Sequence, residues 1–441
     1  MPKTEPSKVT LEKIVALCKR RGFVFPSSEI YGGLANSYNY GPLGAELKKN
    51  VKDLWWRYFV REREDMTGLD GGIILNPKVW EASGHLKNFK DSLVECKKCH
   101  HRFRPDKLKD ASKCPDCGGG FTDQKMFSGM FKTFIGPVEK DALVAYLRPE
   151  TAGAIFLEYK NVVNSTVKKI PFGIGQIGKA FRNEITAGQF IFRMLEFEQM
   201  EIEYFIDPES DWNETFERWV KDIYGFARII GLPEEHFYNH EIEGDDRAFY
   251  SKRTIDIEYL YPWGHDEIWA IAYRTDYDLS RHQEHSGEKM EYLDEKSGRR
   301  FLPHVIEPTF GVDRTVLALL VEAYNEETLE NGEQRVVLKF NPRVAPYKAA
   351  VFPLLKNKPQ LVEKAREIFN ALKNEFTVEF DDNGNIGKRY RRQDEIGTPF
   401  CVTVDFDSLE KDDVTVRDRD TMKQERVKIG ELPEYLKEKL K

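Results

Sequence analysis

The stretch from Ile174 to Ile206 constrains the fold of this chain more than any other. It contains two runs whose side chains alternate as they do in strands, joined by a polar loop. One face carries polar groups: Gln176, Arg182, Glu184, Gln199, Glu201 and Glu203, with Ala180 and Phe197. The other face is apolar: Ile177, Phe181, Met200, Ile202, Tyr204 and Ile206. This pattern predicts a half-buried hairpin whose polar side meets a ligand, with a merely solvated sheet face as the alternative.

Length, charge and apolar content limit the classes of protein that this chain can represent. Its 441 residues exceed one ordinary core, so about two or three domains are expected. A net charge of −7 excludes a global basic field, so a nucleic-acid partner must be held by local patches. The chain has no apolar run of about 18 residues and no signal-peptide core at its start. We expect a cytoplasmic protein without a membrane partner.

Four of the six cysteines form two Cys-x-x-Cys pairs, Cys96 with Cys99 and Cys114 with Cys117. Two such pairs at this spacing supply four thiolates to one tetrahedral Zn²⁺, and six cysteines are too few for a disulfide scaffold. Four sulfur ligands close the coordination shell, so the predicted zinc is structural. The neighbouring pair His100 and His101 is an alternative source of ligands.

The rest of the pattern predicts two domains, residues 1–340 and 341–441. Residues 91–125, with the cysteines, and residues 208–262 are interpreted as insertions into the first domain. A helix over about residues 45–64 has a wide aromatic stripe around Trp55 and Trp56, which suits a core or contact with a second subunit. After residue 340, strands and helices alternate, which predicts a small α/β domain with a mostly parallel sheet.

Several words of the sequence, in order, resemble the α2-type glycyl-tRNA synthetases over nearly the full chain. They are SYNYGPLGAELKKNV, VWEASGH, YLRPETAGAIF, FRNEIT, EFEQMEIEYF, YRTDYDL, VIEPTFGVDR and GKRYRRQDEIGTPFCVTVD. The hairpin resembles motif 2 of the class II aminoacyl-tRNA synthetases, and residues 311–314 resemble motif 3. The resemblance implies an α+β fold: an antiparallel sheet flanked by helices, followed by a C-terminal α/β anticodon-binding domain. Gly173, Gly175 and Gly178 precede a strand rather than a helix, so a dinucleotide loop is rejected.

By this resemblance the chain joins glycine to ATP as glycyl-adenylate and then transfers glycine to tRNA(Gly). Arg182 is expected to bridge the α-phosphate and the glycine carboxylate, and Arg314 to hold the γ-phosphate. Phe197 is expected to stack on adenine, and Glu267 to hold Mg²⁺. The expected ATP site also contains Asn183, Glu184, Phe192, Arg193, Ile268 and Gly311. The alternative for the two arginines is a pair of surface salt bridges.

The same resemblance implies a glycine pocket in which carboxylates surround the ammonium of the substrate. These are Glu150, Glu201 and Glu307, because clustered acids repel one another unless a cation joins them. Arg104, Phe197, Thr309 and Gly311 complete the expected pocket. Thr309 stands where the family usually has serine, so its hydroxyl is kept and a methyl group is added.

For tRNA, the basic run Lys388, Arg389, Tyr390, Arg391 and Arg392 is expected to contact the anticodon, since cations and an aromatic ring suit single-stranded bases. A solvated charged turn is the alternative. A homodimer is expected. The rival function is that of a non-catalytic, synthetase-like accessory protein that binds nucleic acid on the same scaffold.

Overall fold

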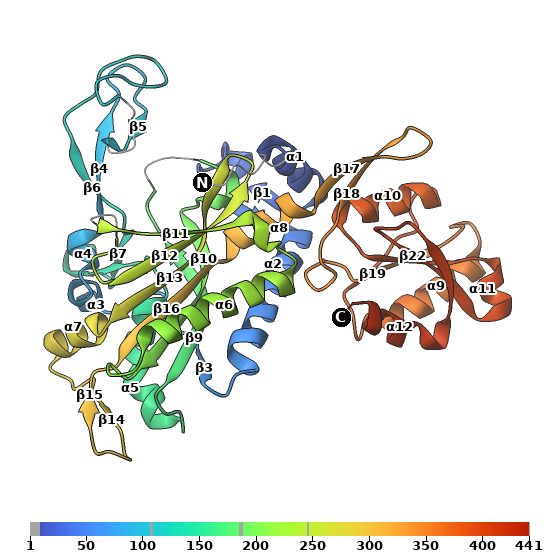
Figure 1. Ribbon diagram of the computed structural model, residues 1–441. Helices are drawn as coiled ribbons and strands as arrows, with labels where there is room; N and C mark the ends of the chain where they lie inside the picture. Colours follow the sequence, from blue (N-terminus) through green and yellow to red (C-terminus); the bar gives the residue numbers. More distant parts are fainter. Residues whose placement is uncertain (1–8, 106–107, 109, 185–187, 245–246, 441) are drawn as a thin grey trace.

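A seven-stranded sheet organises the first domain of the computed structural model, which describes residues 9–440 apart from 106–107, 109, 185–187 and 245–246 (Figure 1). The strand order is β11-β12-β13-β16-β10-β9-β3, and every neighbouring pair is antiparallel except β3 with β9. The strands are β3 (Met66–Leu69), β9 (Phe172–Phe181), β10 (Glu196–Ile206), β11 (Phe237–Glu241), β12 (Arg253–Tyr261), β13 (Gly264–Thr275) and β16 (His304–Gly311). The antiparallel architecture and flanking helices agree with the expected fold class.

Helices cover the two faces of this sheet unequally. The main core lies between one face and α1 (Leu11–Arg21), α2 (Pro42–Trp56), α6 (Trp212–Ile230) and α8 (Val312–Ala323). On the other face, α5 (Ala152–Ser165) and α7 (Tyr277–Ser286) cover only part of the sheet with a smaller core. The remainder of that face is left for the cavity described below. Helix α6 begins where Asp211 accepts hydrogen bonds from two backbone N–H groups and ends at Gly231, whose φ is 86°.

The side-chain alternation predicted for the hairpin is confirmed. Met200, Ile202 and Tyr204 are buried in the main core, and Glu201 lies opposite Gln176 on the other face. The glycines of β9 serve close packing rather than a phosphate loop. A Cβ atom on Gly178 would lie 2.2 Å from Arg148 Nη2, so a side chain there would displace that guanidinium.

Residues 208–262 are not an insertion, and that prediction is wrong. Strands β11 and β12 from this segment extend the central sheet, where β12 pairs with β13 along its length. Phe216, Trp219 and Phe226 of α6 are fully buried in the main core. The polar, Trp-rich composition of the segment hid this role because its apolar residues occupy only one face of each element.

Residues 90–128 do form a unit of their own, a three-stranded sheet of order β5-β4-β6 that projects from the body in Figure 1. Its strands are β4 (Lys90–Glu95), β5 (Arg102–Phe103) and β6 (Lys125–Ser128). Shorter elements surround the body: β1 (Val24–Pro26), β2 (Tyr38–Tyr40), α3 (Lys78–Ala82), α4 (His85–Asn88), β7 (Lys132–Ile135), β8 (Leu143–Tyr146), β14 (Tyr292–Leu293) and β15 (Arg300–Phe301), with short turns η1 (Glu29–Tyr31), η2 (Arg57–Arg61), η4 (Glu139–Asp141), η5 (Phe190–Phe192) and η6 (Glu234–His236).

The aromatic stripe of α2 and the following η2 is buried within the chain. Trp55 and Phe59 are fully buried in the main core, where their rings pack against Phe310. Trp56 and Tyr58 are partly buried against the same core. The stripe therefore does not itself argue for a second subunit. None of the described helices is both long and apolar enough to cross a membrane.

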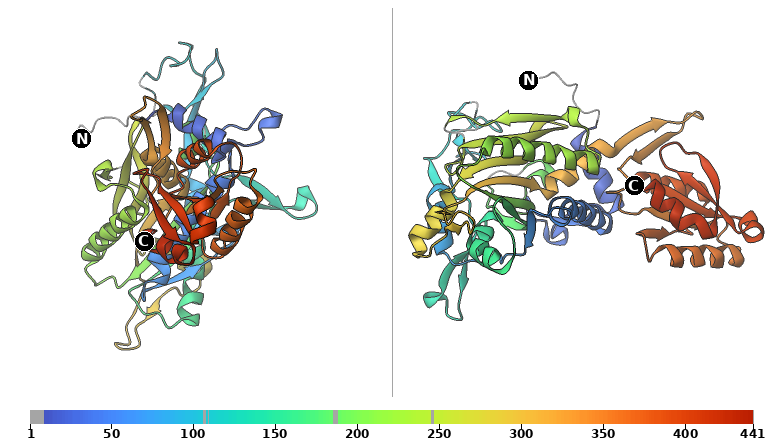
Figure 2. Two further views of the ribbon diagram at one scale, coloured as in Figure 1. Left: turned by 90° about the vertical axis from the view of Figure 1, so that its right-hand side faces the viewer. Right: turned by 60° about the horizontal axis from the view of Figure 1, so that its bottom comes forward.

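The C-terminal domain lies at one end of the body and is joined to it by the hairpin β17 (Tyr324–Thr328) and β18 (Gln334–Leu338) (Figure 2). Its five-stranded sheet has the order β20-β19-β21-β22-β23. Because β19 is parallel to β20 and β21 whereas β22 is antiparallel to β21 and β23, the sheet is mixed rather than mostly parallel. The elements are β19 (Ala349–Pro353), α9 (Pro359–Leu372), β20 (Val378–Phe380), α10 (Ile386–Ile396), β21 (Phe400–Val404), α11 (Phe406–Lys411), β22 (Asp413–Asp418), β23 (Gln424–Lys428), η8 (Ile429–Glu431) and α12 (Leu432–Lys439).

Candidate active site

A cavity of about 580 Å³ opens on the polar face of the central sheet. Its floor comes from β10, β13 and β16, and its rim from the end of β9 and the turn η5. Most of the residues predicted for the ATP and glycine sites line it together: Glu150, Arg182, Glu184, Phe192, Arg193, Phe197, Glu201, Glu267, Ile268, Glu307, Thr309, Gly311 and Arg314. Residues from five separate parts of the chain thus line one cavity. The size of this cavity is ordinary for a small-molecule site.

One end of the cavity is built around Arg182, the residue that follows β9. Its guanidinium lies 5.2 Å from the centre of the Phe197 ring, on the neighbouring strand β10. Its Nε donates a hydrogen bond to the carbonyl oxygen of Pro149 at 3.1 Å. The ring and the carbonyl orient the guanidinium on the cavity wall, so a planar cation is held beside an aromatic surface.

Arg314 occupies the first turn of α8, directly after β16. Its Nη1 donates to the backbone oxygen of Glu267 at 2.8 Å and lies 3.0 Å from the carboxylate of the same residue. The Arg314 guanidinium also lies 4.4 Å from the centre of the Phe192 ring. Burial raises the pKa of Glu267, but the charge of Arg314 prevails and the pKa is lowered, so this carboxylate is charged.

The floor at the other end is acidic. Glu201 accepts hydrogen bonds from the hydroxyl groups of Thr151 and Thr309, the latter at 3.1 Å. Glu150 lies 3.2 Å from His85 Nε2, and Glu307 lies 2.7 Å from Arg274 Nη1. These three carboxyls are each less than a tenth exposed.

The environments of these three carboxyls shift their pKa values in different directions. Burial, followed by the charge of Glu150, raises the pKa of Glu201. Burial also raises the pKa of Glu307, although Arg274 opposes it. Burial would raise the pKa of Glu150 as well, but His85 reverses the effect and lowers it to about 2. A buried set of acids with too few cations favours a positively charged ligand.

Three groups that shape this site were not predicted from the sequence. Arg274 is fully buried and divides its guanidinium between Glu307 and both oxygens of Asp278. His85 contacts Glu150 through Nε2, and Ser83 Oγ lies 2.8 Å from its Nδ1. Both lie in words that carried the family resemblance, YRTDYDL and VWEASGH, but only the strand register and a turn at Gly84 bring them to the cavity.

Asp313 is the third missed group and fixes the start of α8. It accepts hydrogen bonds from Tyr40 at 2.6 Å, from Lys48 at 2.8 Å and from the backbone N–H of Glu198 at 2.8 Å. These contacts lock the helix that carries Arg314 against the strand that carries Phe197 and Glu201.

Two predicted residues lie outside the cavity lining. Asn183 lies just after β9, and its backbone N–H donates a hydrogen bond to the carbonyl oxygen of Gly129 at 2.8 Å. Arg104 belongs to the projecting segment and lies 3.1 Å from Asp91.

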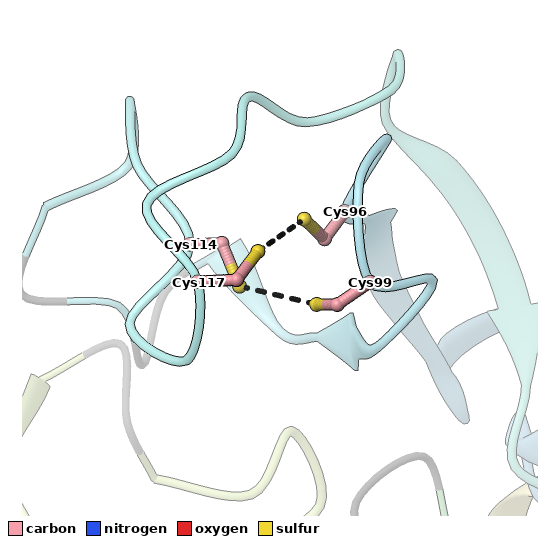
Figure 3. Close-up of side chains that lie close together, drawn as sticks. All are labelled: Cys96, Cys99, Cys114 and Cys117. Atoms are coloured by element: carbon pink, nitrogen blue, oxygen red, sulfur yellow. Dashed lines mark hydrogen bonds between the residues drawn. The ribbon is translucent and has the colours of Figure 1, made fainter.

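The four paired cysteines converge in the projecting segment, as Figure 3 shows. Cys96 Sγ lies 3.4 Å from Cys117 Sγ, and Cys99 Sγ lies 3.6 Å from Cys114 Sγ. Sulfurs bound to one tetrahedral zinc through bonds of about 2.3 Å lie about 3.8 Å apart, so the cluster has nearly the right size. The neighbouring histidines point to carboxylates instead, His100 to Glu95 and His101 to Asp116.

The basic run of the C-terminal domain lies on α10, and its members differ in accessibility. Arg389 is only 1% exposed and donates to the carbonyl oxygens of Pro353, Asp382 and Gly384, so it holds a turn. Tyr390 is half-buried and hydrogen-bonds Thr403. Arg391 and Arg392 pair with Glu333 and Asp381, and Lys388 lies on the exposed side of the first turn.

The fold and the cavity define a class II tRNA synthetase. The family model described as the tRNA synthetase class II core domain (G, H, P, S and T) matches residues 138–324, and the model described as an anticodon binding domain matches residues 348–439. Both matches fall on the two domains of the structure.

Curated relatives identify the family within this class. The chain is 52% identical to the glycine–tRNA ligase of Clostridium acetobutylicum, with 98% of this chain and 99% of the relative covered. It is 51% identical to that of Thermobifida fusca, with 98% of each covered, and 50% identical to that of Caldanaerobacter subterraneus, with 99% of this chain and all of the relative covered. The chain belongs to the glycine–tRNA ligase family.

Proposed function

We propose that this protein ligates glycine to tRNA(Gly) at the expense of ATP, through a glycyl-adenylate intermediate. The observation that carries the proposal is the convergence of Arg182, Arg314 and three buried carboxyls on one cavity. The two guanidinium groups suit the phosphates of a nucleotide, and the acids of the floor suit an ammonium.

In the first step the glycine carboxylate attacks the α-phosphate, and pyrophosphate leaves. Two anions must approach each other, so positive charge at the phosphates lowers the barrier. Arg182 would bridge the attacking carboxylate and the α-phosphate, with Phe197 beneath the adenine. Arg314 would hold the γ-phosphate. Bound Mg²⁺ would neutralise the phosphates, and the half-exposed carboxylate of Glu267 is the group proposed to hold it.

Selection of glycine would come from the acidic floor. Glu150, Glu201 and Glu307 would surround the ammonium, while the Thr309 hydroxyl, which donates to Glu201, would restrict the space beside Cα. A larger amino acid would have to displace these buried groups, and overpacking of this kind costs about 1–3 kcal/mol. The methyl group of Thr309 would narrow the pocket further.

Transfer to tRNA would use both domains. Lys388, Arg391 and Arg392 lie on α10 of the matched anticodon binding domain, and we propose that they contact the anticodon arm. Arg389 would contribute indirectly, because it holds the turn before this helix.

The decisive test is ATP–pyrophosphate exchange with each amino acid in turn. We expect exchange with glycine and its loss in Arg182→Ala, with Arg218→Ala as a matched control on the opposite side of the sheet, where Arg218 contacts Tyr204. Arg182→Lys should also be severely impaired, because an ammonium does not bridge two anions as a planar guanidinium does. Exchange driven by another amino acid would redirect the specificity, and ATP binding without exchange would favour the accessory protein.

We further propose one structural zinc held by Cys96, Cys99, Cys114 and Cys117. Elemental analysis should find about one equivalent per chain, since four thiolates bind one ion. Cys114→Ser should lose the metal and expose residues 90–128 to proteolysis, whereas Lys113→Ala should not. Full zinc content in Cys114→Ser would contradict this assignment.

We propose that the protein works in a reducing cytoplasm, which keeps the cysteines available to zinc.

A homodimer is proposed as the working assembly. The proposed dimer is supported by an exposed apolar turn, where Ile30 is 88%, Tyr31 86% and Leu34 60% exposed. Sedimentation of the wild type and of Tyr31→Glu distinguishes a dimer through this turn from a monomer.

A further inference from the structure

One buried group beside the pocket has no role in the proposed reaction. Glu203 follows Glu201 by two residues on β10, so its side chain points to the same face of the sheet. It is fully buried, and within the described part of the chain neither of its carboxyl oxygens has a hydrogen-bond partner. Buried carboxylates are ordinarily paired, so this group requires an explanation.

Along β10, Glu203 lies where the strand passes from the cavity into the apolar core. Before it, Phe197, Gln199 and Glu201 line the cavity, and after it Phe205 belongs to the apolar core under α5 and α7. The register that pairs Glu201 with Thr309 and Tyr204 with Ile306 puts Glu203 opposite Glu307. Glu203 therefore lies beneath the acidic floor, between the ligand space and the core.

The local balance of charge is strongly negative. One carboxyl oxygen from each of Glu201, Glu203 and Glu307 lies within 4.8 Å of the others. The cation that acts on this group, Arg274, already binds Glu307 and both oxygens of Asp278. Burial, followed by repulsion from Glu307, raises the pKa of Glu203 well above its usual value. A negative charge on Glu203 would have neither solvent nor a free cation to stabilise it.

We propose that Glu203 is a positioning residue that remains protonated in the working enzyme. As a neutral carboxyl it supports Glu201 and Glu307 from below and fixes their separation without adding negative charge to the floor. The pocket then presents acids that a single ammonium can balance, which favours glycine over a divalent cation. This inference rests on the proposed glycine site.

The test separates charge from shape. Glu203→Gln keeps the shape of a neutral carboxyl, so KM for glycine and kcat in pyrophosphate exchange should stay within about twofold of wild type. Glu203→Ala removes the support, so KM for glycine should rise about tenfold or more while KM for ATP changes little. Glu196→Gln, an exposed position on the same strand that pairs with Lys179, is the matched control.

Infrared difference spectroscopy of wild type against Glu203→Gln provides a readout that needs no turnover. At pH 7 the difference spectrum should contain the C=O stretch of one protonated carboxyl, which wild type has and the variant lacks. Absence of this band in wild type, or a rise in KM for glycine in Glu203→Gln as large as in Glu203→Ala, would overturn the proposal. Failure of wild type to exchange with glycine would instead refute the proposed function, even with the band present.

Discussion

His85 lies behind the acidic floor and contacts it through one ring nitrogen while the other faces Ser83. Glu150, by contrast, is 7% exposed and approaches the ligand space directly. The histidine therefore sets the orientation of a pocket carboxylate without lining the cavity itself. Residues that contact a binding group without touching the ligand hold that group in the geometry that binding requires.

We predict that His85→Phe raises KM for glycine about tenfold or more, because one buried hydrogen bond to a charged group contributes about 1.5–3 kcal/mol. KM for ATP should change little, since Arg182 and Arg314 are untouched. Steady-state exchange kinetics check both values. His285→Asn, an exposed histidine of α7, is the control. Equal effects on both substrates would show general disruption rather than a role in the pocket.

Protonation of Glu203 also predicts how stability depends on pH. Its pKa in the folded chain is raised well above the ordinary 4.5, so the folded state keeps a proton that the unfolded chain releases. The contribution is fully present below about pH 4.5 and is lost as pH rises, by at most about 1.4 kcal/mol per pH unit.

Urea denaturation between pH 5 and about 8 measures this slope. In Glu203→Gln the decline in the free energy of unfolding with pH should be shallower than in wild type, while Glu196→Gln should follow wild type. Identical slopes in all three proteins would show that Glu203 does not hold a proton.

At the scale of elements, the junction between β16 and α8 determines where Arg314 lies. A Cβ atom added to Gly311 would lie 3.3 Å from Arg314 Cδ and 3.3 Å from the Ile268 carbonyl oxygen. The backbone oxygen cannot move without disturbing β13, so the arginine side chain must move instead.

Gly311→Ala should therefore raise KM for ATP more than KM for glycine, by about fivefold or more, with a small change in melting temperature. Gly430→Ala, where nothing lies within 4 Å of the new methyl group, is the control. Unchanged ATP kinetics in Gly311→Ala would mean that Arg314 tolerates displacement.

The same scale explains what could be predicted from the sequence. Alternation along β9 and β10 assigned Glu201 and Met200 to opposite faces because a strand's period is a local property. Arg274 was missed because its role depends on pairing between β13 and β16, which no local pattern records. Residues 208–262 were misassigned for the same reason: membership of a sheet depends on distant partners, here β12 with β13.

At the scale of the whole molecule, a buried ionic cluster joins the two domains. Asp394 of α10 accepts from Arg335 of β18 at 2.9 Å and from Arg417 of β22 at 2.9 Å. Arg419 adds hydrogen bonds to the carbonyl oxygens of Gly397 and Phe340, each at 2.8 Å. The β17–β18 hairpin, which follows α8, is thus bound to α10, the helix proposed to contact tRNA.

Asp394→Asn leaves the buried Arg417 without its charge partner and leaves Arg335 with Glu327 alone. Breaking a buried ion pair in this way costs about 3–5 kcal/mol. We expect the C-terminal domain to loosen, so aminoacylation of tRNA should fall tenfold or more while glycine-dependent exchange falls about twofold at most. The surface substitution Glu434→Gln should affect neither. Parallel loss of both activities would indicate unfolding of the catalytic domain as well.

The alternation along β10 has a practical consequence for any preparation of this protein. A slip of this strand by one residue would exchange its two faces, sending Met200, Ile202 and Tyr204 into the cavity and the acids into the main core. Partial activity cannot arise from such an error, because every recognition group on the strand is lost at once. Active-site titration should therefore count the correctly assembled molecules, and a low specific activity would measure a mixture rather than a weakened catalyst.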